Sequence, residues 1–137
     1  MAYTKTVTIV PAVNAATAHT DLPPGRYFVV IITETDCGAS DEAAIPLPLA
    51  GMFLEIHAQD CYNATGGVTV DPILGRSTNP AGLDILILND TPAATIHNAP
   101  SSKAPRYISG STLYHRSQPA SGSNNSVTTE YIFKRVQ

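Results

Sequence analysis

Four histidines, two cysteines and eleven acidic residues are the side chains of this sequence that could perform acid–base or nucleophilic chemistry. A nucleophilic serine or cysteine needs a neighbouring histidine and a third group that orients it. No G-x-S-x-G turn surrounds a serine, and proximity between cysteine and histidine cannot be inferred from these spacings. The sequence therefore predicts no catalytic residue. The histidines are His19, His57, His97 and His115, and the cysteines are Cys37 and Cys61.

Metal and phosphate sites have no strong signature either. No two histidines have the close spacing of zinc ligands, and Thr65-Gly66-Gly67 lacks the lysine that follows in a phosphate loop. Glu55 and His57 are predicted to share one face of a strand, and with Asp60 they form the group closest to a metal-binding cluster. Alternating polar residues on a strand, however, usually form its solvated face. We expect no metal, no cofactor and no enzymatic activity, with a small β-barrel enzyme as a remaining alternative.

The two cysteines do not form a C-x-x-C pair. Free buried thiols are the first expectation for Cys37 and Cys61, and a disulfide is the alternative if their strands are neighbours.

Four tyrosines are candidates for contacts with a ligand, because tyrosine combines an apolar ring with a polar hydroxyl and suits partly solvated surfaces. Tyr107, Tyr114 and Tyr131 are the candidate surface-binding aromatics, and Tyr27 is the fourth tyrosine of this group. The opposing interpretation is that these rings pack at strand ends or at subunit interfaces. The absence of tryptophan removes the commonest platform for sugar stacking.

Short runs rich in valine, isoleucine and threonine alternate with turn residues, and no helical pattern stands out. We predict an all-β fold, a compact antiparallel sandwich or barrel of about seven to nine short strands with little helix. The expected strands cover residues 5–13, 26–35, 52–58, 68–70, 83–89, 94–98, 106–108, 112–116 and 126–136.

Three of these segments carry more specific expectations. The apolar run 26–35 follows a Pro23-Pro24-Gly25 turn and is predicted to be buried on both faces. Segments 106–108 and 112–116 flank Ser109-Gly110-Ser111 and are predicted to form a hairpin. Segment 126–136 alternates, with Tyr131 and Phe133 on one face.

Residues 1–20 are interpreted as an N-terminal arm or as the first strand, followed by a single all-β domain over residues 21–137. As an arm, this segment would bind a partner by adding a strand to a sheet edge, and deletion of residues 2–20 would leave the domain folded. The candidate binding residues are Thr4, Thr6, Val7, Thr8, Ile9 and Val10.

Composition limits the function. Only 14% of the 137 residues are charged, against about 25% in ordinary domains. The net charge of −3 argues against nucleic-acid binding, and neither a signal peptide nor a membrane-spanning segment is recognisable. Low charge on expected strands indicates that other chains cover part of their surface.

Three pieces of sequence resemble the knob-like domains of bacteriophage tail fibres and pyocin fibres. Leu22-Pro23-Pro24-Gly25-Arg26-Tyr27-Phe28 resembles their opening motif, and the Pro46–Ile56 segment resembles the proline-rich element that follows. Leu113–Arg116 and Tyr131–Arg135 resemble their ending, with Phe133 in place of the usual tryptophan.

The resemblance implies a structural protein on the exterior of a phage virion. Its partners would be further copies of itself, as a homotrimer, and capsid or tail proteins, with the chain acting as a decoration (cement) protein or a fibre knob. The alternative is a knob at a tail tip that recognises a host receptor or surface glycan. Neither role implies a nucleic acid or membrane partner.

Overall fold

The computed structural model describes residues 3–11, 22–38, 44–64, 68–77, 85–88, 96–98, 106–108 and 112–137. These residues form ten strands and no helix, so no helix in this part of the chain is long and apolar enough to span a membrane. The strands are β1 (Thr4–Val10), β2 (Tyr27–Cys37), β3 (Ile45–Leu47), β4 (Leu54–Asn63), β5 (Val70–Gly75), β6 (Ile85–Leu88), β7 (Ile96–Asn98), β8 (Arg106–Ile108), β9 (Leu113–Pro119) and β10 (Asn125–Arg135).

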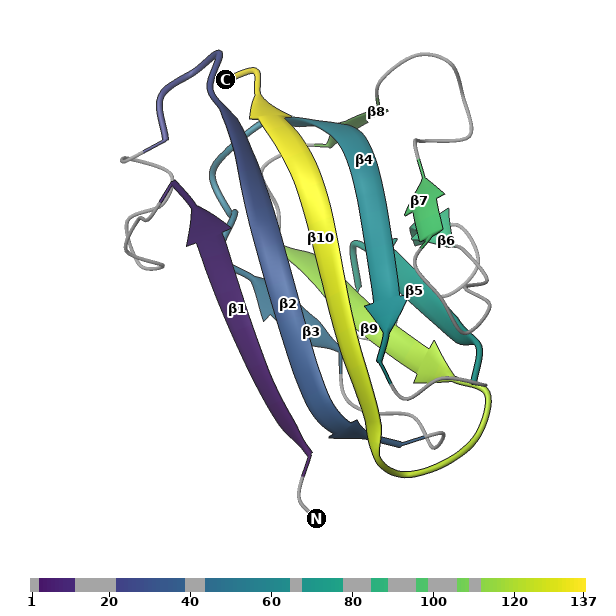
Figure 1. Ribbon diagram of the computed structural model, residues 1–137. Helices are drawn as coiled ribbons and strands as arrows, with labels where there is room; N and C mark the ends of the chain where they lie inside the picture. The colour runs from purple at the N-terminus through teal and green to yellow at the C-terminus, as the bar shows by residue number, and fades with distance from the viewer. Residues whose placement is uncertain are drawn as a thin grey trace.

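The strands form two antiparallel sheets that face each other (Figure 1). The large sheet has the order β1-β2-β10-β4-β7, with β8 also paired to β4, and the small sheet has the order β3-β9-β5-β6. Figure 1 shows the small sheet crossing behind the large one. The predicted all-β class is therefore confirmed, in its sandwich form.

The main core lies between the sheets. From the large sheet, Phe28 and Phe133 stack with their ring centroids 5.6 Å apart. From the small sheet, Leu47, Leu74 and Leu113 join the same buried cluster. Since burying one such side chain is worth about 1.5–3 kcal/mol, this cluster is the main force that holds the two sheets together.

Strand β10 follows the alternation that its sequence predicts. Val127, Thr129, Tyr131 and Phe133 are buried, while the residues between them are half-buried. This central strand pairs with β2 on one side and with β4 on the other. Its inward residues therefore supply the middle of the core.

Strand β2 corrects a prediction. Phe28, Val30 and Ile32 are buried, but Val29 and Ile31 are only half-buried. The run is not buried on both faces, because the small sheet covers just one of them. The apolar residues on the other face are left without cover in the described part of the chain.

The predicted hairpin over residues 106–116 is also wrong. Strand β8 pairs with β4 in the large sheet, whereas β9 pairs with β3 and β5 in the small sheet. The chain therefore passes from the large sheet to the small sheet between β8 and β9. Local turn residues signal a change of direction but do not determine which strand the chain pairs with next.

The turn before β2 forms as its sequence predicts. The Arg26 amide donates to the Pro23 carbonyl at 3.1 Å, and Gly25 has a φ of 85°. Proline followed by a positive-φ glycine is typical of a type II turn. The Gly25 amide also donates to the Arg135 carbonyl at 2.7 Å, which ties this turn to the end of β10.

Residues 4–10 are the first strand of the large sheet. β1 pairs with β2 along its whole length, from Thr4 opposite Thr35 to Val10 opposite Val29. Ile9 is buried in the main core. Deletion of residues 2–20 would remove this strand, so the expectation that the remaining domain stays folded without it does not agree with the fold.

Candidate functional site

The predicted binding segment lies at the edge of the large sheet. Its residues divide between two faces: Val7 and Ile9 turn inward, whereas every second residue is exposed. Among the described residues, no strand pairs with the free edge of β1. The six predicted residues Thr4, Thr6, Val7, Thr8, Ile9 and Val10 therefore combine a core role with an accessible edge.

Lys5 modifies what this edge can bind. It is exposed and lies on the same side of β1 as Val7 and Ile9, in register with Glu34. Inward-facing charges on edge strands are a common defence against uncontrolled strand pairing. The edge of β1 is therefore less open to a partner strand than its threonine-rich sequence suggests.

The three selected tyrosines do not form one surface. Tyr131 is fully buried, so its selection as a surface-binding aromatic is wrong. Tyr114 is half-buried in β9 of the small sheet. Tyr107 lies in β8, where its backbone is opposite Glu55 of β4. The structure does not describe the Tyr107 side chain.

The remaining candidates are scattered. Cys37 and Cys61 are buried thiols that form no disulfide, as first expected, and they lie in a second apolar cluster with Val70 and Val127. His19 lies outside the described residues. Within the described part of the chain, histidine, cysteine and acidic side chains form no group of three that could hold a metal ion.

His115 belongs to a buried polar network that the sequence did not predict. The network joins Glu34 of β2, Gln59 of β4, His115 and Ser117 of β9, and Tyr131 of β10. All five side chains are at most 1% exposed. The network thus connects both sheets through the interior.

The hydrogen bonds of Gln59 determine the direction of the network. Its amide nitrogen lies 3.3 Å from the Pro72 carbonyl, which can only accept, and 3.1 Å from the Tyr131 hydroxyl. The Tyr131 hydroxyl therefore accepts from Gln59 and donates to Nδ1 of His115, 2.6 Å away.

The second half of the network ends at one carboxylate. Nε2 of His115 donates toward the Ser117 hydroxyl at 2.9 Å, and that hydroxyl donates to Oε1 of Glu34 at 2.5 Å. The Tyr3 hydroxyl, just before β1, donates to Oε2 of Glu34 at 2.7 Å. Every donor along the path points toward Glu34, an arrangement that suits the ionised carboxylate because it only accepts.

The ionisation of Glu34 follows from these donors. Burial alone raises the pKa of Glu34, but hydrogen bonds from His115, Ser117 and Tyr3, together with the electrostatic attraction of the His115 ring, outweigh it. Together they hold the pKa below its ordinary value of 4.5. The carboxylate is thus a stable end point for the network.

The network does not have the geometry of a hydrolytic triad. There the histidine accepts from serine at one ring nitrogen and donates to the acid at the other. Here Ser117 and Glu34 both lie at Nε2, and Ser117 donates directly to the acid. Burial also raises the pKa of Tyr131. With all its members buried, this network cross-links the two sheets and offers no nucleophile to a substrate.

The outer face of the large sheet, the side turned away from the small sheet, has a different character. The strand registers place Val10, Val29, Ile132 and Ala58 side by side across four strands. We call these four residues the apolar row. Val10 is 48% exposed and the others are half-buried. The row runs the width of β1, β2, β10 and β4.

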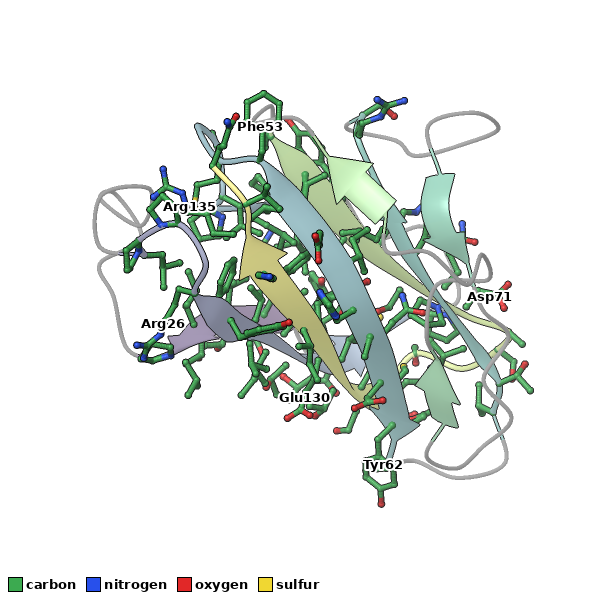
Figure 2. The ribbon with its side chains drawn as sticks, turned by 90° about the horizontal axis from the view of Figure 1, so that it is seen from above. Arg26, Phe53, Tyr62, Asp71, Glu130 and Arg135 are labelled. Carbon is green, nitrogen blue, oxygen red and sulfur yellow. The ribbon has the colours of Figure 1, made fainter. Side chains whose placement is uncertain are left out.

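Charged residues lie on both sides of the apolar row. On one side, Glu130 and Asp60 are opposite each other, next to Ile31. On the other side, Lys134 lies between Tyr27 and Glu55 in the registers of β2 and β4. Figure 2 shows Glu130 on the side of β10 that faces away from the small sheet.

Tyr27 is the centre of an exposed cluster at this end of the sheet. Tyr27 is 53% exposed, and Lys134 Nζ lies 5.4 Å from the centre of its ring. The His57 ring packs against it in a T-shaped arrangement, with 5.1 Å between the ring centroids. His57 in turn lies 2.8 Å from Glu55, on the shared face predicted for these two residues. Aromatic, cationic and anionic groups thus adjoin the apolar row.

Comparisons with models of protein families, with curated proteins and with solved structures found no match.

Proposed function

We propose that this protein is a non-enzymatic structural protein that self-associates and binds to a larger assembly. The observation that carries the proposal is the apolar row on the outer face of the large sheet, which no described element covers. A free domain usually keeps more charge on such a face to remain soluble. A face of this composition favours coverage by other protein chains.

The sequence resemblance supplies the setting of the proposal. It favours the exterior of a phage virion, where the protein would act as a capsid decoration (cement) protein or a fibre knob, and it favours a trimer. The exposed edge of β1 offers an additional contact for a capsid or tail protein. Lys5 would limit that contact to a partner able to accommodate its charge.

The buried network supports a structural role over an enzymatic one. The serine, histidine and acid that lie within hydrogen-bonding distance are Ser117, His115 and Glu34, and all three are buried. Their hydrogen bonds satisfy one another instead of preparing a nucleophile. They stabilise the sandwich, which an exposed particle component requires.

A second candidate function is recognition of a host-surface glycan at a tail tip. The Tyr27 cluster favours it, because an exposed ring beside the hydrogen-bonding groups of His57 and Glu55 suits a sugar. In a glycan-array assay of the purified protein, binding that is lost in Tyr27→Ala but kept in Tyr62→Ala would favour this candidate.

Electron microscopy of virions made with and without the gene for this protein tests the main proposal. We expect additional density on the surface of particles that contain the protein, and loss of that density in the deletion. Purified protein added back should restore it. Particles that look identical with and without the gene, and contain no copy of the chain, would contradict the proposal.

A further inference from the structure

The outward residues of β10 are arranged symmetrically about the apolar row. Glu130 lies two residues before Ile132, and Lys134 lies two residues after it. Successive residues on one face of a strand are about 7 Å apart. An acid and a base therefore lie at equal distances on opposite sides of the same isoleucine, too far apart to pair within one chain.

A second copy of the chain can use this symmetry. A two-fold axis that runs along the apolar row turns the outer face of one copy onto that of another. Ile132 then meets Ile132, and Lys134 of each copy faces Glu130 of the other. In β2, the same rotation brings Tyr27 of one copy over Ile31 of the other, so an aromatic ring covers a half-buried aliphatic side chain.

Strand β4 is compatible with the same rotation. The register shift beside Ile132 interrupts the alternation of this strand, so that the consecutive residues His57 and Ala58 are both half-buried. The rotation directs Asp60 of the second copy toward Glu55, which lies in register with Lys134 and 2.8 Å from Nε2 of His57. No acidic pair is forced together without a histidine at the contact.

We infer that the outer face of the large sheet is a two-fold interface between copies of this chain, with the apolar row on the axis and paired Lys134–Glu130 contacts on both sides. This inference deepens the proposed function and rests on its self-association. An isologous interface of this kind gives an even number of subunits: a dimer, or a hexamer if a three-fold contact is also present.

The apolar content of β2 is independent support. Val29 and Ile31 belong to the most apolar run of the sequence, yet the sandwich covers only the opposite face of this strand. Face-to-face packing of a second sheet is the standard way to bury such a surface, at about 10 Å between sheets. A second copy supplies that sheet with complementary charges.

Reversal of the two charges tests the interface by sedimentation equilibrium at low ionic strength. Lys134→Glu and Glu130→Lys each place like charges opposite one another, and we expect either to weaken self-association at least about tenfold. The double variant restores opposite charges across the axis and should return to within about threefold of the wild type. Arg76→Glu, an exposed reversal after β5 of the small sheet, is the matched control and should change nothing.

A second variant tests the apolar contact on the axis and leaves Lys134 and Glu130 unchanged. Ile132→Glu places two carboxylates at the axis and should give monomers with an unchanged circular dichroism spectrum. An assembly whose size is unchanged by Ile132→Glu and by both charge reversals would overturn this interface while leaving the proposed function standing. A wild-type protein that is monomeric at all concentrations would overturn both.

Discussion

The two faces of the large sheet differ in where their polar groups lie and in what surrounds them. On the inner face, Glu34 and Tyr131 lie in a closed network in which each donor has an acceptor. On the outer face, Glu130 and Lys134 lie beside an apolar row that no described element covers. The small sheet covers the inner face within one chain, whereas the described elements leave the outer face uncovered, and we propose that a second copy covers it.

The network also shows why chemistry-bearing residue types are weak indicators of catalysis. Ser117, His115 and Glu34 are of the residue types found in hydrolytic sites, but the order of their hydrogen bonds and their burial fit a structural cross-link. What separates the two roles is the direction of the hydrogen bonds. That direction is set by Gln59 and the Pro72 carbonyl, neither of which belongs to a catalytic motif.

The largest effect should come from Glu34→Gln. The substitution removes the charge that accepts from Ser117 and Tyr3 and places amide hydrogens against their hydroxyls. We expect a loss of about 3 kcal/mol in the free energy of unfolding, measured by urea denaturation. The matched control is Glu130→Gln on the outer face, which should change the free energy of unfolding by less than about 0.5 kcal/mol. Equal losses would erase the contrast between the two faces.

Tyr131→Phe should have the next largest effect. It keeps the buried ring but leaves Nδ1 of His115 and one amide hydrogen of Gln59 without partners. Such a loss costs about 1–3 kcal/mol of unfolding free energy. Tyr62→Phe removes the same hydroxyl from a tyrosine that is 47% exposed and should be neutral. A neutral Tyr131→Phe would mean that the network is not oriented as derived.

A smaller and gradual effect should appear on acidification. The folded-state pKa of Glu34 lies below its ordinary value of 4.5, so between these values the unfolded chain binds the proton more readily. The stabilisation is therefore complete above about pH 4.5 and is lost as the pH falls through the folded-state value. Urea denaturation at several pH values should show this loss in the wild type and a weaker one in Glu34→Gln.

The smallest effect should come from Thr33→Val on the outer face. Thr33 is exposed in β2, in register with Thr6 and Thr128. Its change should alter the free energy of unfolding by less than about 0.5 kcal/mol. Thermal denaturation of the variant measures this directly, and a clear destabilisation would show that the outer face also contributes to the core.

Much of the fold could be predicted from the sequence, because alternation reports directly on which face of a strand is buried. The inward set of β10 and the shared face of Glu55 and His57 are examples. The partners of β8 and β9 could not be predicted, because turn residues report only on the neighbouring chain whereas the strands that these two pair with are distant in sequence.

The buried network could not be predicted for a related reason. Ser117 and Glu34 are 83 positions apart, and no local spacing links them. The one available signal was a lone acid within the most apolar run of the chain, which calls for a buried partner. The apolar row was similarly hidden, because it appears only when four strands are placed in register.

The most direct test of the central claim is a mixing experiment with the two single charge reversals, followed by sedimentation velocity. Alone, Lys134→Glu presents two acids and Glu130→Lys presents two bases, so each variant should lose the two-fold contact and sediment as half of the wild-type assembly, which is a monomer if the wild type is a dimer. Across a two-fold axis the mixed pair has both contacts complementary, so an equimolar mixture should form a heterodimer. A mixture that stays monomeric while the wild type associates would contradict the claim that the outer face joins two copies.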